Sequence, residues 1–281
     1  MKRILTPTRD RDTKGTTLNV SISIGHRMNK RIQSRIDEMI KATERELVRL
    51  FNGDDYAISY AMDENIGAQA RMLMSKLWRR FEKLFRELAY PVTKELIHLA
   101  EKDSAATLKA SLSKIVDTMT LPVEAMTPQL QEVIAASSAR NVALIRRVPA
   151  EYLGPIEQAV YQSITTGRGL ADLKPFLEKQ RVKVRNWAHN VSLDQTRKVY
   201  EDMTSARMIG IGIDEYEWIH SGGSNHPREY HRDVLAGQVF KLSDPPIIDP
   251  RTKQRGHPGT LPYCRCRKRP IVRFRPKEVP T

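Results

Sequence analysis

The repeat of apolar residues at helical spacing is the feature that most constrains the fold of this chain. From Asn29 onward, apolar side chains recur at steps of three and four residues, as in Ile32, Ile36 and Ile40. This period places them on one face of an amphipathic helix. The pattern predicts helices over residues 29–52, 66–90 and 92–119. Pro91 is expected to break or kink the helix between the last two stretches, because proline interrupts helical hydrogen bonding.

A second group of predicted helices follows the breaker-rich linker Leu121–Pro128 and covers residues 129–147, 151–166, 171–180 and 184–210. Three regions are therefore expected. They are an extended N-terminal arm (1–28), a helical region (29–120) and a domain (129–281) whose helices (129–210) precede a β-rich terminal part (212–281). The predicted fold class is mainly α, with helical N-terminal and central regions and a small C-terminal α+β, loop-rich subdomain.

The ends of the chain show strand signals. Residues Leu18–Ile24 alternate apolar and small polar side chains, which predicts a strand that pairs with another part of the protein or with a neighbouring subunit. Near the C-terminus, short β-prone runs at 216–219, 239–240 and 271–274 are separated by Gly, Pro and Asp. The core of this terminal part is expected to be too small to be secure alone.

Positive charge dominates the composition. The formal net charge is +14, and residues 251–281 hold ten Lys or Arg and one acidic residue, Glu278. Such a segment suits a polyanion such as DNA, although a solvated tail or a surface that docks on an acidic protein face are open alternatives. The candidate phosphate-contacting residues are Arg265, Arg267, Lys268, Arg269, Arg273 and Arg275. Without a run of 18 apolar residues, no transmembrane helix is predicted.

The two cysteines, Cys264 and Cys266, are separated by one residue, which argues against a disulfide framework and fits a reducing compartment. In an extended segment they face the same side, with Arg265 on the other. Together with His231 and His257, and with His226 in reserve, they form the ligand set of a structural zinc site. Two interpretations stay open: zinc binding, or packing of both thiols as small hydrophobic side chains while His231 hydrogen-bonds a loop carbonyl.

Catalytic chemistry has weaker support. His226, Asn225 and His231 could belong to a metal-dependent nuclease, in which an imidazole activates water and a metal stabilises phosphate. The density of carboxylates that a magnesium site requires is missing from this part of the sequence. No catalytic residue is assigned, and the chain is expected not to be an enzyme.

Eight short motifs follow one another in a fixed order: Asn141–Ile145, Gly167–Leu170, Asp194–Lys198, Gly212–Trp218, His226–His231, Gly237–Phe240, Pro258-Gly259 and Cys264–Cys266. Within them stand Gly-Ile-x-x-Tyr-x-Trp, Pro-Arg-x-x-His, Gly-x-Val-Phe and Cys-Arg-Cys. No single piece is specific, but the ordered series resembles the phage Mu F-like minor head proteins, also called the phage head morphogenesis family. The resemblance covers roughly residues 130–274.

The resemblance implies a structural protein that is built into the procapsid in few copies near the portal vertex. The implied partners are the portal protein, the major capsid protein or scaffold, and packaged double-stranded DNA, with no membrane involved. The implied location is the virion, with the host cytoplasm during assembly. On this basis the N-terminal strand is expected to pair with a partner's sheet edge or to be anchored in the portal. The rival hypothesis is a metal-dependent nuclease acting on DNA.

Overall fold

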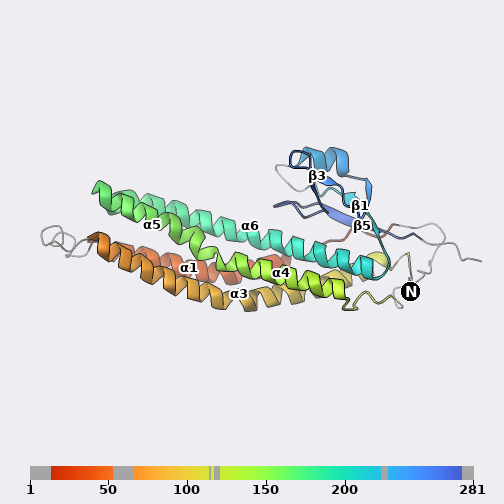
Figure 1. Ribbon diagram of the computed structural model, residues 1–281, viewed down its shortest axis with the longest axis horizontal. Helices are drawn as coiled ribbons and strands as arrows, with labels where there is room; N and C mark the ends of the chain where they lie inside the picture. The colour runs from red at the N-terminus through yellow and green to blue at the C-terminus, as the bar shows by residue number, and fades with distance from the viewer. Residues whose placement is uncertain (1–13, 53–65, 114, 117–120, 223–226, 274–281) are drawn as a thin grey trace, which may run out of the picture. The chain divides into compact units, whose positions relative to one another are not determined.

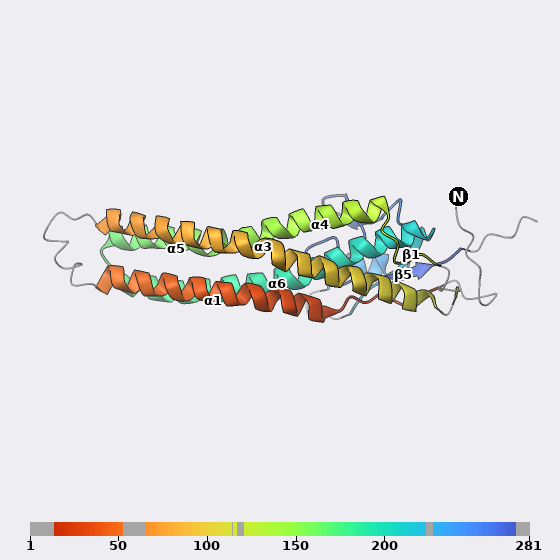
Figure 2. The same cartoon turned by 90° about the horizontal axis from the view of Figure 1, so that it is seen from below.

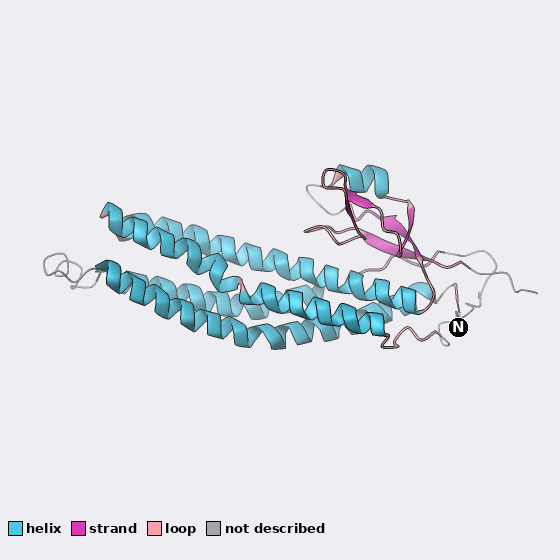
Figure 3. Ribbon diagram, viewed as in Figure 1, coloured by secondary structure: helices cyan, strands magenta, loops and turns pink. Residues whose placement is uncertain are grey.

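The computed structural model describes residues 14–52, 66–113, 115–116, 121–222 and 227–273 of the chain. These residues form long α-helices, short β-strands near the C-terminus and one π-helix (Figure 1, Figure 3). The α-helices are α1 (Ile22–Asn52), α3 (Ile66–Leu112), α4 (Pro128–Arg146), α5 (Val148–Thr166) and α6 (Leu170–Gly210). This arrangement confirms the predicted fold class. None of the described helices is both long enough and apolar enough to cross a bilayer.

The chain divides into two compact units, and neither is continuous in sequence. The bundle unit contains His26–Glu95 and Ser138–Ser192, whereas the sheet unit contains Met1–Gly25, Leu96–Ser137 and Leu193–Thr281. The divisions fall inside helices α1, α3, α4 and α6. The units therefore do not follow the chain order of the three regions predicted from the sequence.

In the bundle unit, parts of α1, α3, α5 and α6 pack against one another, as the turned view in Figure 2 shows. Polar contacts mark the outer edges of the packing: Arg80 of α3 bonds Glu38 of α1 at 3.0 Å, and Trp78 of α3 bonds Glu157 of α5 at 2.9 Å. Between the helices lies an apolar core of large side chains, which include Ile36, Met39, Met74, Phe81, Phe85, Leu153, Ile156 and Leu177. The helical periodicity of the sequence therefore marked a true buried face.

Two predicted helix breaks are wrong. Pro91 lies inside α3, which runs without interruption from Ile66 to Leu112. Its ring is exposed, while the neighbouring Ala89 and Val92 are buried, so packing on either side holds the helix together despite the missing hydrogen bond. Similarly, α6 continues through residues 181–183, because Arg and Lys form helices well even where no apolar side chain marks the buried face.

The sheet unit contains a three-stranded antiparallel sheet in the order β2 (Val239–Lys241), β1 (Glu215–Ile219) and β5 (Arg267–Ile271). Strand β1 is central, with Tyr216 opposite Phe240 on one side and opposite Pro270 on the other. Strands β3 (Ile247–Asp249) and β4 (Gln254–Arg255) form a second, two-stranded sheet. The π-helix η1 (Tyr230–Leu235) stands between β1 and β2 in the sequence.

The predicted strand over Leu18–Ile24 is wrong in its second half, where α1 begins at Ile22. The residues before it run in extended form along the open edge of β5: Gly15 N–H donates to the Pro270 carbonyl at 2.9 Å, and Leu18 N–H donates to the Lys268 carbonyl at 2.9 Å. This segment therefore pairs with another part of the protein, which is one of the two predicted alternatives, and it covers the edge of the chain's own sheet.

The core of the terminal part is larger than its own strands could provide. Trp218 and Tyr216 of β1 share one cluster of buried side chains with Leu108 of α3, Tyr200 of α6 and Leu18 of the N-terminal segment. The ends of two long helices thus complete a core that the terminal residues alone would leave too small to be secure.

Candidate functional site

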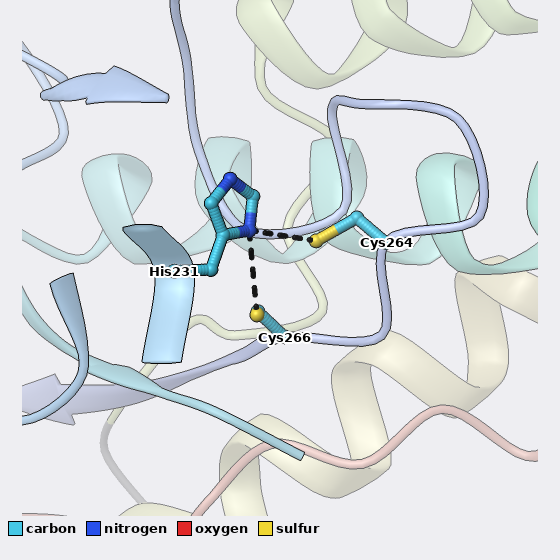
Figure 4. Close-up of side chains that lie close together, drawn as sticks. All are labelled: His231, Cys264 and Cys266. Carbon is cyan, nitrogen blue, oxygen red and sulfur yellow. Dashed lines mark hydrogen bonds between the residues drawn. The ribbon is translucent and has the colours of Figure 1, made fainter. Parts of the chain in front are cut away.

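Three of the four predicted metal ligands lie together in the core of the sheet unit (Figure 4). The His231 Nδ1 atom is 3.6 Å from the Cys264 Sγ atom and 3.7 Å from the Cys266 Sγ atom. All three ligand atoms lie within 4.8 Å of one another. The residues are 2%, 3% and 6% exposed, respectively, so the cluster is closed to bulk solvent.

The three side chains come from two separate elements of the backbone. His231 lies in the π-helix η1, a rare conformation that is often found at functional positions. The two cysteines precede β5 in an extended segment, so both face His231 and Arg265 faces outward, as the alternation predicted. The turn before them is fixed by Tyr263, whose φ is 59° and whose N–H donates to the Asp194 carboxylate at 2.7 Å.

Hydrogen bonding fixes the tautomer of His231. Its Nε2 atom lies 2.9 Å from the backbone carbonyl oxygen of Ile248. A carbonyl oxygen can only accept, so Nε2 carries the proton and Nδ1 presents its lone pair to the two sulfurs. A backbone carbonyl on the far nitrogen is the usual partner that orients a metal-binding histidine.

The two thiols differ in acidity. The Cys264 pKa is lowered below its usual range, chiefly because Cys266 hydrogen-bonds to it and secondarily because of His231, against the opposing effect of burial. The same bond between the cysteines raises the pKa of Cys266. The pair therefore favours one thiolate, carried by Cys264.

His257 does not join this group, which corrects the fourth predicted ligand. Its Nδ1 atom lies 3.0 Å from the Tyr216 hydroxyl, and its ring makes an edge contact with the Tyr216 ring. Burial, together with the positive charge of Lys268, lowers its pKa to about 3, so the imidazole is neutral at physiological pH. His226, the reserve ligand, and Asn225 of the nuclease hypothesis lie outside the described residues.

The predicted phosphate-contacting residues fall into different environments. Arg265 and Arg267 are exposed, and with Arg197 of α6 and Glu201 they line a cleft of about 170 Å³, here called the arginine cleft. Burial lowers the pKa of Arg197, and the charge of Arg265 lowers it further, which shows that positive charge is concentrated there. Arg275 lies outside the described residues.

Lys268 is a correction, because a fully buried lysine cannot contact DNA. It is 0% exposed, its Nζ atom lies 3.0 Å from the Glu201 carboxylate, and it also donates to the Ser205 hydroxyl. Arg269 and Arg273 keep some exposure but pair with Glu217 and Glu215, at 3.4 and 2.8 Å. Fewer of the ten cations are therefore available to contact phosphate than the sequence suggested.

Arg197 and Glu201 were not predicted as site residues. A signal was present in α6, since Arg197 and Lys198 each lie three or four residues from both Asp194 and Glu201, which places the four on one side of the helix. Asp194 pairs with Lys198 at 2.7 Å. That spacing indicates a charged helix face, but not which of its members would meet residues 70 positions further along the chain.

Comparison with known proteins supports the family resemblance that the ordered motifs indicated. Residues 155–269 match the family model described as Phage Mu protein F like protein. An uncharacterized protein of Haemophilus influenzae is 25% identical over 217 residues, which cover 76% of this chain and 47% of that protein. The chain thus spans about half the length of this relative. No solved structure matches. The match over residues 155–269 supports the resemblance to the phage Mu F-like family that the ordered motifs predicted.

Proposed function

We propose that this protein is a minor head protein of a tailed phage, which acts in head assembly near the portal vertex. The observation that carries the proposal is the family match over residues 155–269, which include all of α6 and nearly all of the described sheet region. The proposed partners are the portal protein, and the major capsid protein or scaffold. The proposed location is the virion, with the host cytoplasm during assembly.

The assembly role is testable by reconstitution. The portal, scaffold and major capsid proteins of the same phage are co-expressed with and without this chain, and procapsids are purified by sedimentation. We expect the chain to co-sediment with procapsids in a copy number close to that of the portal, and to associate with purified portal. Procapsids that form normally and contain none of the chain would contradict the proposal.

Contact with packaged double-stranded DNA is the second part of the proposal, and the arginine cleft supports it. Three guanidinium groups, from Arg197, Arg265 and Arg267, line one concave surface. Guanidinium groups suit phosphate because their donors form a planar fork. Such contact is blind to sequence and falls steeply with salt, because each neutralised phosphate releases counterions.

The matched variants are R265Q/R267Q and R79Q/R86Q, which remove equal charge from the cleft and from exposed positions of α3. DNA retardation is measured against salt concentration. We expect the first variant to lower the slope of log affinity against log salt by about 0.9 for each phosphate that it no longer neutralises, and the second to leave it nearly unchanged. Equal behaviour of the two variants would refute the cleft as the DNA-binding surface. Plasmid cleavage in the presence of Mg²⁺, Mn²⁺ or Zn²⁺ would instead favour a nuclease.

A further inference from the structure

We propose that His231, Cys264 and Cys266 bind one zinc ion, which acts as a structural crosslink within the sheet unit. The three residues come from two elements separated by more than 30 positions in the sequence. One thiolate–imidazole–thiolate set would join the π-helix η1 to the segment that leads into β5. The proposal concerns the internal structure of the protein and is independent of its role in the phage head.

The spacing of the ligand atoms already matches a tetrahedral site. Zinc binds sulfur at about 2.3 Å and imidazole nitrogen at about 2.0–2.1 Å, so tetrahedral angles place these two atoms roughly 3.5 Å apart. The observed separations between the His231 Nδ1 atom and the two sulfurs are 3.6 and 3.7 Å. An ion could therefore enter with little movement of the side chains.

Hydrogen bonds alone cannot use both nitrogen–sulfur contacts of this cluster. The Nδ1 atom of His231 has a single lone pair, and Nε2 holds the ring's proton against Ile248. Only one of the two thiols can therefore donate to the ring, although both sulfurs lie at similar distances. A metal ion would use the lone pair and both sulfurs at once, which removes the mismatch.

The surroundings supply the supporting contacts of a thiolate site. The indole N–H of Trp218 is buried and, among the described residues, has no hydrogen-bond partner of ordinary length. Its ring stands edge-on to His231, with centroids 5.1 Å apart, and the side chain lies close enough to Cys266 to act on that sulfur. Metal-bound thiolate sulfur is a good acceptor for such a donor.

The space beside the ligands could hold a fourth ligand. A cavity of about 20 Å³ adjoins the cluster, bordered also by His220, Ser221 and Arg228. It can hold roughly one water molecule, which could complete the tetrahedron as a fourth ligand. The three ligands are 2–6% exposed and lie in the core of the sheet unit, so the ion would act mainly as a crosslink that stabilises the fold.

The test uses the full chain, purified under reducing conditions, with zinc alone as the probe. We expect about one zinc per chain by elemental analysis. Competition with a chromophoric chelator should show that C264S and C266S each weaken zinc binding by on the order of 100-fold or more. The matched control is H257Q, which removes the predicted ligand that lies outside the cluster and should keep full zinc content.

A second measurement uses the wild-type chain, so that the test does not depend on the folding of the variants. Cobalt replaces zinc in the wild-type chain, and the absorption spectrum should show thiolate-to-cobalt charge transfer with the intensity of a four-coordinate site. Stripping metal from the wild-type chain should lower its thermal midpoint, and zinc should restore it. A fully folded wild-type chain that binds no zinc, or zinc content that falls equally in H257Q, would overturn the assignment.

Discussion

The two units of this protein bury different kinds of side chain. The bundle unit has an apolar core, and its described buried polar residues, such as Thr43, Thr93 and Asn141, are uncharged. Each buried charged residue that the structure describes lies instead in the sheet unit: Asp194, Glu201, Arg207, Glu217 and Lys268. Apolar packing tolerates many sequences, whereas a buried charge requires a specific partner.

The two units therefore place different requirements on the amino-acid sequence. The bundle unit depends on hydrophobic periodicity, which many residue combinations satisfy. The sheet unit depends on particular pairs, such as Lys268 with Glu201, and on the cluster around His231. Substitutions should therefore change the free energy of unfolding, and its dependence on pH, differently in the two units.

The largest effect is expected for Lys268→Ala. Removing this cation leaves the Glu201 carboxylate buried without its partner, which should lower the free energy of unfolding by about 3–5 kcal/mol. Urea denaturation measures the decrease. The double variant K268M/E201Q removes both charges and should recover much of it; a double variant as unstable as the single one would mean that the charge pair is not the cause.

Met74→Ala tests the bundle core. Met74 is completely buried in α3, and its truncation should cost about 2–5 kcal/mol, because apolar burial decreases and a cavity is left behind. Since no charge is involved, the destabilisation measured by urea denaturation should be the same at pH 8 and pH 5. A destabilisation that varies strongly with pH would show that apolar packing alone does not describe this core.

His257→Gln tests the pH response of the sheet unit. The folded-state pKa of His257, about 3, lies below its ordinary value, so the unfolded chain binds more protons between the two values. The contribution of neutral His257 to the free energy of unfolding should therefore be fully present above about pH 6.5 and should decline as pH falls toward 3. Allowing for partial exposure, H257Q should remove on the order of 2 kcal/mol of the decline between pH 7 and pH 4. Parallel curves for the two proteins would exclude His257 as the titrating group.

The smallest effect is expected for Glu38→Gln in the bundle unit. Glu38 pairs with Arg80 at 3.0 Å, but the two side chains are 35% and 49% exposed. Water screens such a pair, so the substitution should change stability by less than about 1 kcal/mol. The contrast with Lys268 isolates burial as the variable. A destabilisation similar to that of K268A would remove the distinction between the two units.

The sequence predicted what periodicity and alternation control. Ile32, Ile36 and Ile40 marked a buried helix face, and the spacing of Cys264 and Cys266 placed both sulfurs on one side. The same rules failed at Pro91, where packing on either side maintained α3, and at residues 181–183, where helix-forming residues continued α6 without an apolar pattern. Local pattern is therefore informative only where tertiary contacts do not oppose it.

Pairing over long distances could not be predicted from one sequence. His231 and His257 are equivalent candidates by composition, and only the fold shows that one faces the cysteines while the other bonds Tyr216. Likewise, Lys268 has the same local setting as Arg267 and Arg269. Its burial follows from the pleat of β5 and from the position of Glu201 on α6.

The short N-terminal segment along β5 has a consequence for the order in which the protein is made. Gly15 and Leu18 bond Pro270 and Lys268, which the ribosome adds some 250 residues later. The bundle helices emerge earlier and can begin to associate during synthesis, whereas the sheet unit must wait until β5 has emerged. A product truncated before β5 would therefore lack the sheet edge along which the N-terminal segment lies.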